Sequence, residues 1–348
     1  MTEHPNRTAY VKSAWQFQVR DNPVGDPGPG RLLLEVHACG ICGTDLHIAD
    51  RTAADWQTFG HEAAGVVKAV GEGVTRFAPG DRVALDSSAP CGKCASCLPL
   101  PYGRGRPDLC PNPVNYWAGQ TMGFSRLLIA PQECAVHVPD HLPLDHACLV
   151  EPLGVCIDLA QTADVRPSDH VLVVGPGPLG LGAVYVARQM GAERIWLAGR
   201  SGSKARLETG LALGADAVIE VDRRPLAQHD FGGRKPDKVL VTAPPDALPE
   251  AVAVAALGGS IAYIGIAWDA RATIQLDADA FHFSKLSLRA SHAWPGTHAR
   301  HSLRLLATDP ALGPALVSHR FGLEEIERAM LAARDDRAHV KKAVVVMA

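Results

Sequence analysis

Short hydrophobic runs broken by glycine and proline dominate the first part of the chain. Turn signals at residues 26–30, 71–73 and 79–81 separate these runs. The pattern predicts an irregular, barrel-like β-rich domain over residues 1–150. Its predicted strands are Arg31–His37, Ala64–Val70, Arg82–Leu85 and Leu127–Ile129.

After residue 150 the pattern changes to continuous apolar runs that alternate with helix-like segments. Such an alternation is typical of a parallel sheet that helices cover on both faces, and we assign it to residues 151–317. The predicted strands are Val171–Val174, Ile195–Ala198, Ala217–Glu220, Val239–Thr242, Ser260–Ile264 and Leu286–Ala290, and the predicted helices include Ala183–Met190, Lys204–Leu213 and Leu248–Leu257.

The last segment, residues 318–348, returns to the first pattern. It predicts a strand, a helix over Leu323–Arg334 and a closing strand over Lys342–Met347. We expect this tail to pack back onto the first domain.

Composition narrows the class of protein. The 348 residues are 47% hydrophobic, and 37 acidic residues against 34 Lys and Arg give a net charge of −3. This balance provides no overall positive field for nucleic acid or anionic lipid. The apolar runs are far shorter than the roughly 20 residues of a membrane span, and the N-terminus shows no signal-peptide pattern. We therefore expect a cytoplasmic protein with no nucleic-acid and no membrane partner.

Four of the nine cysteines are closely and regularly spaced, which points to metal rather than to disulfides. Four thiolates can close a tetrahedral shell around a structural zinc ion. The alternatives are buried cysteines that bind no metal and a zinc ribbon that binds DNA. The loop carries no aromatic and basic recognition surface, which argues against DNA binding. The four residues are Cys91, Cys94, Cys97 and Cys110, at spacings x2, x2 and x12.

A second group combines a thiol, an imidazole and carboxylates. A catalytic zinc site needs about three protein ligands and one open position. Cys42 and His61 supply suitable sulfur and nitrogen, and either Glu62 or Glu151 can supply the oxygen. The sequence leaves the choice between these two carboxylates open.

Three residues near Cys42 are candidates for catalytic support. Asp45 is suited to orient a ligand. Thr44 and His47 can pass a proton from a buried alcohol to solvent, because a hydroxyl and an imidazole both donate and accept. Each of them alone is more often structural, and their clustering favours the catalytic interpretation.

A glycine-rich loop follows the apolar run at residues 171–174. Gly175, Gly177 and Gly180 form a G-x-G-x-x-G pattern, with Pro178 and Leu179 inside it. After a strand and before a helix, this pattern predicts a dinucleotide site, where the first two glycines allow the pyrophosphate to approach and the third allows close packing.

The end of the next predicted strand bears on the choice of cofactor. An acidic residue there would bind the ribose 2′-hydroxyl, but the position holds Gly199. Arg200, Ser201 and Lys204 follow and can bind a 2′-phosphate. The sequence therefore favours NADP(H) over NAD(H).

Taken in order, these motifs resemble the zinc-containing medium-chain dehydrogenases/reductases of the alcohol, polyol and threonine dehydrogenase group. The resemblance rests on CGICGTDLH (39–47), GHEAAGVV (60–67), GVTRFAPGDRV (73–83), the cysteine loop, Glu-Pro-Leu (151–153), VLVVGPGPLG (171–180) and HRFGLEEIERAM (319–330).

The resemblance implies a GroES-like catalytic domain over residues 1–150, completed by residues 318–348, and a doubly wound Rossmann domain over residues 151–317. It also implies a homo-dimer or homo-tetramer. By the family pattern Cys42 and His61 bind the catalytic zinc.

The family pattern also bears on the oxygen ligand. Glu62 takes the position that ligates zinc in polyol and threonine dehydrogenases. Glu151 is similar to the residue that joins or replaces that ligand in sugar dehydrogenases.

The implied activity is a hydride transfer between NADP(H) and a secondary alcohol or ketone, with Thr44 and His47 as the proton relay. A polyol, sugar or cyclitol is the expected substrate. The alternatives are a threonine-type or simple-alcohol dehydrogenase that uses NAD, a zinc-free reductase that acts on enones, and a non-catalytic, crystallin-like or regulatory dinucleotide-binding protein.

Two segments depart from the family pattern. The stretch between His47 and Gly60 is short and lacks the usual Tyr- and Pro-rich run, so we expect an unfamiliar substrate pocket. The insert Pro99–Pro107 lengthens the cysteine loop.

Overall fold

The computed structural model describes residues 3–117 and 119–347, and the contacts divide the chain into two compact units. No helix in these described residues is both long enough and apolar enough to pass through a bilayer. The first unit consists of the residues up to Gly154, Ala293–Asp336 and the residues from Lys342 onward, and the second consists of Val155–His292 and Arg337–Lys341.

This division differs from the expected limits of 151–317 for the second domain. Helices α8 (Ala299–Thr308) and α9 (Leu312–Leu316) belong to the first unit because both contact α2 (Leu144–Ala147). Apolar residues on these short helices, such as Leu312, are buried there. The sequence pattern in this stretch gave no sign of that packing.

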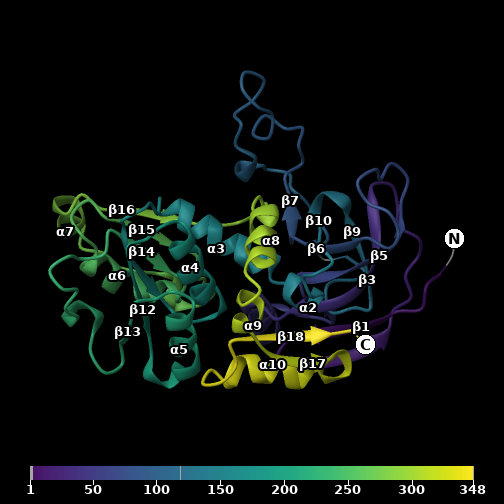
Figure 1. Ribbon diagram of the computed structural model, residues 1–348. Coiled ribbons are helices and arrows are strands. Elements are labelled where there is room, and N and C mark those ends of the chain that lie inside the picture. Colours follow the sequence, from purple (N-terminus) through teal and green to yellow (C-terminus); the bar gives the residue numbers. More distant parts are fainter. Residues whose placement is uncertain (1–2, 118, 348) are drawn as a thin grey trace. The chain divides into compact units, whose positions relative to one another are not determined.

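A seven-stranded sheet forms the body of the first unit (Figure 1), in the order β10-β6-β5-β3-β18-β17, with β9 also paired to β3. The four strands predicted in residues 1–150 all occur in it. Strand β18 pairs antiparallel with β3, so the C-terminal tail completes this sheet. The strands are β3 (Arg31–Gly40), β5 (Glu62–Val70), β6 (Arg82–Leu85), β9 (Leu127–Pro131), β10 (Ala135–His137), β17 (Val317–Gly322) and β18 (Lys342–Val346).

Two smaller sheets in the first unit were not predicted. One has the order β2-β1-β4, and the other pairs β7 with β8. Strand β2 alternates between exposed and half-buried residues, so it contains no apolar run. The bounds are β1 (Arg7–Lys12), β2 (Gln16–Asp21), β4 (Gln57–Thr58), β7 (Ser88–Ala89) and β8 (Val114–Asn115).

Helix α10 shows how local hydrogen bonding moves a predicted boundary. The pattern predicted a helix over Leu323–Arg334, but Leu323–Glu325 forms a separate 3-10 turn before α10 (Ile326–Asp335). The Gly322 amide donates to the Glu325 carboxylate at 2.9 Å, which caps this turn. The other helices that begin in this unit are α1 (Gly43–His47) and α3 (Val150–Thr162), and a π-helical turn (Ile48–Thr52) follows α1.

The second unit is built on a six-stranded, all-parallel sheet in the order β13-β12-β11-β14-β15-β16. This is the 3-2-1-4-5-6 order of a Rossmann fold, which confirms the predicted doubly wound sheet. The strands are β11 (His170–Val174), β12 (Arg194–Gly199), β13 (Ala217–Glu220), β14 (Lys238–Val241), β15 (Ser260–Tyr263) and β16 (Ser287–Ala290).

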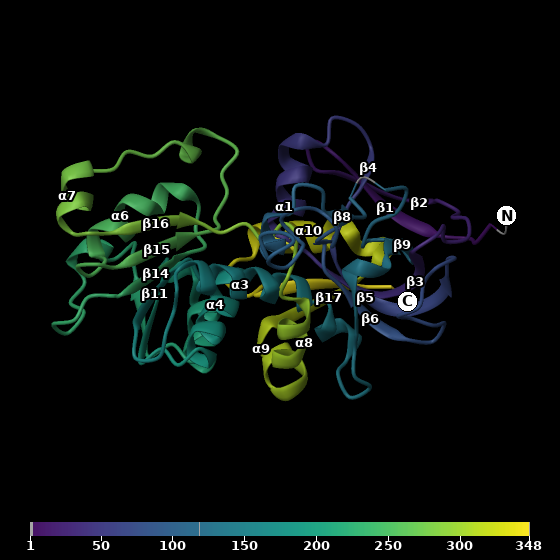
Figure 2. The same cartoon turned by 90° about the horizontal axis from the view of Figure 1, so that it is seen from above.

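Helices cover both faces of this sheet (Figures 1 and 2), with α4 and α5 on one face and α6 on the other. The central strands are therefore buried on both sides, which explains their continuous apolar sequences. Trp196 is 2% exposed and packs edge-on against Phe231 in this core. The helices are α4 (Pro178–Gln189), α5 (Lys204–Ala212), α6 (Leu248–Val254) and α7 (Ala278–Phe283).

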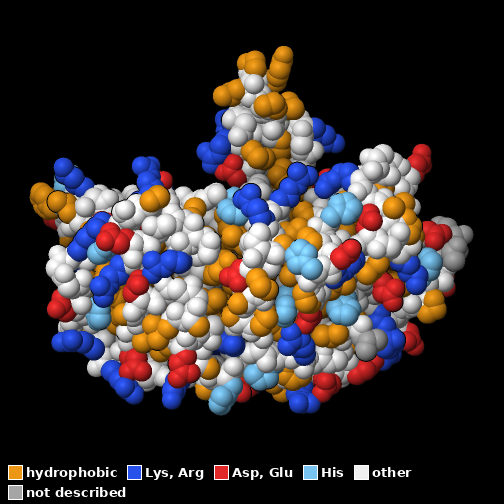
Figure 3. Space-filling model, viewed as in Figure 1, with side chains coloured by type: hydrophobic (Ala, Val, Ile, Leu, Met, Phe, Trp, Pro, Cys, Tyr) orange, Lys and Arg blue, Asp and Glu red, His pale blue; other side chains and the backbone are white. Residues whose placement is uncertain are grey.

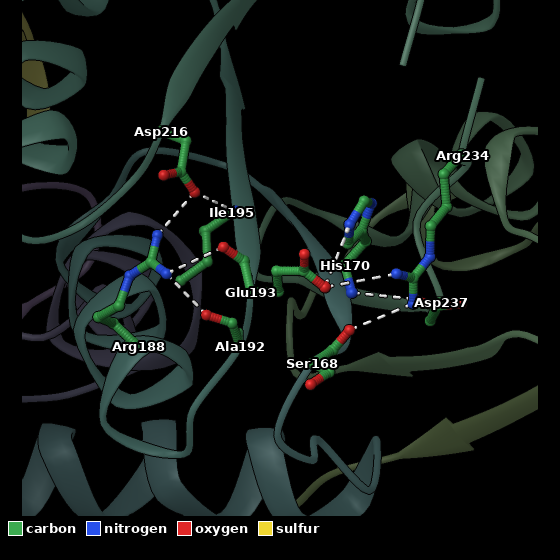
Figure 4. A network of polar contacts seen from close by, with 9 residues as sticks. All are labelled: Ser168, His170, Arg188, Ala192, Glu193, Ile195, Asp216, Arg234 and Asp237. Atoms are coloured by element: carbon green, nitrogen blue, oxygen red, sulfur yellow. Dashed lines mark hydrogen bonds and ion pairs between the residues drawn. The ribbon is translucent and has the colours of Figure 1, made fainter. Parts of the chain in front are cut away.

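A polar network ties together the amino ends of the parallel strands (Figure 4). Arg188 of α4 donates to Asp216 at 2.6 Å, and the same carboxylate accepts the amide of Ile195 at 2.7 Å. Asp237 accepts the amide of His170 at 2.9 Å. These contacts fix the strand starts, so the opposite, carboxyl ends are held in place for the loops that follow them.

Candidate active site and metal centres

Strand pairing brings the two predicted ligand motifs together. Cys42 follows β3 and precedes α1, whereas His61 directly precedes β5. Strands β3 and β5 are antiparallel, with Gly40 opposite Glu62. The sequence-distant thiol and imidazole therefore lie at the same end of one strand pair.

The Asp45 carboxylate joins these two motifs. It is fully buried, and it accepts the Cys42 amide at 2.8 Å and the Gly60 amide at 3.2 Å. The Nδ1 atom of His61 lies 3.7 Å from the Asp45 carboxylate. Burial raises the pKa of Asp45, while His61 acts in the opposite direction. Gly60 has a φ of +88° and faces the Phe124 ring, so a side chain would not fit there.

Cys42, His61 and Glu62 form one of two described groups whose possible ligand atoms all lie within 4.8 Å of one another. Burial alone lowers the pKa of His61, but the facing Cys42 and Asp45 raise it well above its usual value. A sulfur, a nitrogen and an oxygen donor at this separation fit a zinc ion with an open position.

Glu151 does not belong to this group of three. It lies close enough for its charge to act on His61, and it hydrogen-bonds with Ser87. Burial raises the pKa of Glu151, an effect that His61 partly opposes. The geometry therefore favours Glu62 as the third donor and leaves Glu151 as a neighbour.

Lys342 of β18 pairs with Glu62, although 280 residues separate them in the chain. Its Nζ donates to Glu62 Oε1 at 2.5 Å, and both side chains are almost fully buried. Burial lowers the pKa of Lys342, but the charge and hydrogen bond of Glu62, together with the nearby Cys42, outweigh it and raise the pKa. A Cβ at Gly40 would collide with this ion pair, so glycine is needed there.

Asp86 is a further buried carboxylate, and no sequence motif marked it. Burial raises its pKa well above the usual value, and the charge of Glu151 adds to the effect. A Cβ at Gly296 would collide with the Asp86 carboxylate, so the backbone packs directly on it. The nearby signal in the sequence was an acidic residue directly after the predicted strand 82–85.

Thr44 and His47 lie on α1, immediately after Cys42. The Thr44 Oγ1 is 3.7 Å from the Cys42 Sγ. His47 ends the same short helix, three residues later. The Thr44 hydroxyl therefore lies next to the Cys42 thiol, and His47 lies on the same helix as Thr44.

Two aromatic residues beside His61 were also missed. The Tyr116 hydroxyl donates to the His61 carbonyl at 2.7 Å. The Trp117 ring lies 4.8 Å from the His61 ring and meets Trp294 edge-on at 6.1 Å. They come from an irregular segment without periodicity, so no pattern marked them.

The four-cysteine loop forms the second described donor group. Its Sγ–Sγ distances include 3.5 Å for Cys94–Cys97, 3.8 Å for Cys94–Cys110 and 4.0 Å for Cys91–Cys97. A tetrahedral zinc site with bonds of about 2.3 Å requires edges of about 3.8 Å. The loop forms a lobe whose tip exposes hydrophobic side chains (Figure 3), among them Leu100 and Tyr102.

The pKa values of two of these thiols shift in opposite directions. The backbone amide of Lys93 is the main cause that lowers the pKa of Cys91 to about 6. Burial, followed by the hydrogen bond with Cys94, raises the pKa of Cys97 to about 12. Four thiols at this separation fit a single cation better than four neutral side chains.

The glycine loop joins β11 to α4 in the second unit. Gly175 has a φ of +108°, and a Cβ at Gly180 would collide with the Gly175 carbonyl. Gly177 is the N-cap of α4, and a Cβ there would meet no atom within 4 Å. Pro178 and Leu179 form the first turn of that helix. The arrangement matches a pyrophosphate site at a helix N-terminus.

Gly199 ends β12, as the sequence predicted. A Cβ at this position would lie 2.5 Å from Pro176 Cγ, so the glycine also has a packing role. Lys204 begins α5, and its Nζ lies 3.9 Å from the Glu208 carboxylate.

Arg200 and Ser201 differ in their surroundings. Arg200 is exposed at the start of the loop. The Ser201 amide and hydroxyl both donate to Asp222, each at 2.7 Å. Asp222 thus places a carboxylate where the sequence analysis expected only groups that bind phosphate.

Two family models match the chain in sequence order. Residues 28–140 match the alcohol dehydrogenase GroES-like domain, and residues 178–307 match the zinc-binding dehydrogenase model.

Related proteins agree with these models. An L-threonine 3-dehydrogenase of Deinococcus deserti is 29% identical over 91% of this chain and 93% of its own length. A sorbitol dehydrogenase of Bacillus subtilis is 28% identical over 97% of this chain and 96% of its own. The solved alcohol dehydrogenase TADH of Thermus sp. ATN1 is 27% identical, with a TM-score of 0.85 over 98% of this chain and 100% of that one.

The chain belongs to the zinc-containing medium-chain dehydrogenases/reductases, with a GroES-like domain and a Rossmann domain. Within this family it is an enzyme of the alcohol and polyol dehydrogenase type.

The buried Lys342–Glu62 pair predicts a large effect on stability. In metal-depleted protein, Lys342→Met should lower the free energy of unfolding by about 3–5 kcal/mol, because it leaves the Glu62 charge buried and unpaired. The Lys342→Met/Glu62→Gln double variant should recover much of this loss. Urea unfolding followed by circular dichroism measures both, and equal losses in the single and double variants would contradict the assignment.

Proposed function

We propose that the enzyme transfers a hydride between NADP(H) and a secondary alcohol or ketone, with a polyol, sugar or cyclitol as its substrate. The observation that carries this proposal is the collection of Cys42, His61 and Glu62 donor atoms within 4.8 Å. A complete donor set favours a zinc enzyme over the zinc-free reductases.

The substrate class rests on similarity. Relatives named sorbitol dehydrogenase and L-threonine 3-dehydrogenase both align along nearly the whole chain. A screen of hexitols, cyclitols, simple secondary alcohols and threonine with both cofactors tests the choice. Turnover of threonine alone would replace the polyol proposal with the threonine-type alternative.

Cys42, His61 and Glu62 would hold the catalytic zinc ion, which supplies Lewis acidity toward an alcohol or carbonyl oxygen. Asp45 keeps the first two in register through the Cys42 and Gly60 amides. Lys342 balances part of the charge on Glu62. This arrangement favours a single, fixed position for the reacting oxygen.

The proton relay uses the residues of α1. Thr44 Oγ1 lies beside Cys42, where it can accept the proton of the substrate hydroxyl as it gives up its own hydroxyl proton. His47, three residues further along the helix, can take the proton that Thr44 gives up and release it toward solvent. Gly175, Gly177 and Gly180 would hold the pyrophosphate of the dinucleotide, which would supply the hydride acceptor.

The two donor groups predict different consequences when one cysteine is replaced. Cys42→Ala should lose one zinc per chain and lower kcat about 1,000-fold or more, because the Lewis acid is lost. Cys94→Ser, the matched control, should also lose one zinc, and it should reduce thermal stability while keeping most of the turnover.

Metal content by mass spectrometry, kcat and cofactor titration would be compared for the two variants. Both should bind the dinucleotide. Full activity in a zinc-depleted Cys42→Ala enzyme would exclude the proposed catalytic site.

Cofactor preference depends on the loop after β12. The exposed guanidinium of Arg200 supports NADP(H) as the preferred cofactor. The Asp222 carboxylate accepts the hydrogen bonds of the Ser201 amide and hydroxyl, and its negative charge would repel a 2′-phosphate. We propose that the attraction between Arg200 and a 2′-phosphate is stronger than the repulsion by Asp222.

Arg200→Ala should therefore lower kcat/KM for NADP⁺ by about 10- to 100-fold, the value of a lost charge-assisted bond, and leave NAD⁺ unchanged. Asp222→Asn should act in the opposite direction by removing the repulsion. The ratio of kcat/KM for the two cofactors measures both effects. A strong NAD⁺ preference that neither substitution alters would overturn the assignment.

We also propose a homo-oligomer, built from dimers. Strand β16 is an edge of the six-stranded sheet. Large exposed hydrophobic side chains come from the segments next to it in sequence: Phe283 ends α7 just before β16, and Ile266 and Trp268 follow the neighbouring strand β15. An edge strand with apolar neighbours favours pairing with the same strand of a second copy.

Light scattering after size-exclusion chromatography should give at least twice the 36.9 kDa chain mass. Phe283→Glu should shift the population toward the monomer, because it buries a charge at the proposed contact. Tyr102→Glu, on the lobe tip, provides the control for a general effect of surface charge. A monomeric wild-type enzyme at micromolar concentration would contradict the proposal.

We propose that the enzyme acts in the cytoplasm. Its proposed partner is a small-molecule alcohol or ketone. The nine cysteines are all free thiols, including the four that would bind the structural zinc. A reducing compartment preserves such a set.

A further inference from the structure

A pocket of about 430 Å³ lies on the first unit. This volume falls within the range of about 300–1,000 Å³ that is typical of small-molecule sites. Its walls come from β1, the π-helical turn after α1, β4 with the residue before it, and the segment that contains Trp117.

The pocket adjoins the candidate catalytic residues on two sides. Trp117 lines it, and the Trp117 ring lies 4.8 Å from the ring of His61. Ile48, another lining residue, directly follows the relay residue His47. A substrate whose hydroxyl reacts at the donor cluster therefore has this pocket within reach of its remote end.

The lining combines aromatic rings with amides. Trp56, Trp117 and Tyr10 present ring surface, and Gln57 and Gln120 add carboxamides. The Trp117 Nε1 atom is buried and has no hydrogen-bond partner among the described residues. Ring faces that pack against C–H groups, together with amide donors and acceptors, suit a polyhydroxylated chain.

Arg20 of β2 is not itself a lining residue, but its positive charge lies against two of the lining rings. Its guanidinium carbon lies 4.9 Å from the Tyr10 ring centre and 4.6 Å from the Trp56 ring centre. Gln18 accepts hydrogen bonds from two of its nitrogens, at 2.8 and 2.6 Å. A guanidinium has five N–H donors, so three stay available in a position that the two rings fix.

No carboxylate of the described residues forms an ion pair with Arg20. The described residues of β1, β2 and the π-helical turn include four Lys or Arg side chains. Three of them form an ion pair with a carboxylate, and Arg20 is the one that does not. Both contacts that hold it, the rings and the Gln18 amide, are uncharged. The three pairs are Arg7 with Asp21, Lys12 with Asp55 and Arg51 with Asp50.

We propose that this pocket binds the end of the substrate remote from the reacting hydroxyl, and that Arg20 selects a polyol chain ending in an anionic group. The inference rests on the proposed polyol dehydrogenase activity and narrows its substrate class. Phosphate and carboxylate share the required chemistry, because each accepts parallel N–H bonds from a guanidinium.

The test compares three matched series: hexitols, their terminal phosphate monoesters, and hexonates of the same configurations. Wild-type enzyme should show a kcat/KM at least about tenfold higher for one anionic series than for the neutral hexitols. Whichever anionic series is preferred identifies phosphate or carboxylate as the group bound.

Arg20→Gln should remove this preference, lowering kcat/KM for the anionic series by about 10- to 100-fold and leaving the hexitols within about twofold. Arg51→Gln is the matched control, because its guanidinium already pairs with Asp50, and it should change neither series. An equal loss on neutral and anionic substrates in Arg20→Gln would indicate a structural role and overturn the proposal.

Binding separates this inference from the proposed activity. Calorimetry with the Cys42→Ala enzyme should give tighter binding of the anionic series than of hexitols, and Arg20→Gln in that background should abolish the difference. If the anionic series binds more tightly but the wild-type enzyme turns over none of the substrates, the proposed function is contradicted and the anion subsite is supported. If the enzyme turns over hexitols but prefers the anionic series neither in kcat/KM nor in binding affinity, the proposed function is supported and the anion subsite is contradicted.

Discussion

A single buried carboxylate holds the candidate active site together. Asp45 is completely removed from solvent, and its two oxygens accept the amides of Cys42 and Gly60 while it faces His61. A buried charge is tolerated only while its partners remain in place. The corner between β3 and α1 and the entry to β5 therefore cannot separate without a large cost. The thiol and the imidazole keep their spacing through a residue that is not itself one of the three grouped donors.

The candidate site was predictable wherever its residues occur in a local motif. Cys42 and His61 were recognised because ligand types and glycines surround them at typical spacings. Lys342 was not, because only the pairing of β18 with β3 brings it to Glu62, and no periodicity encodes that register. Trp117 lies in an irregular segment, where side-chain direction depends on the tertiary fold.

The fold shows the same division between local and long-range information. The six parallel strands were predicted because burial on both faces leaves continuous apolar runs. The small β2-β1-β4 sheet was not, because β2 is half exposed and β4 has only two residues. The residues that line the proposed substrate pocket, and Arg20 beside it, come in part from this unpredicted sheet. Sequence motifs thus identified the chemistry of the site but not the surface that would select its substrate.

Strand β18 follows the whole parallel sheet along the chain, which sets an order of assembly during synthesis. The whole Rossmann sheet, which ends at Ala290, leaves the ribosome before Lys342 is made. Until β18 inserts beside β3, the Glu62 carboxylate lacks its Lys342 partner and its sheet lacks two strands. During vectorial folding the six-stranded sheet can therefore form first, and the catalytic centre matures only after Lys342 has emerged.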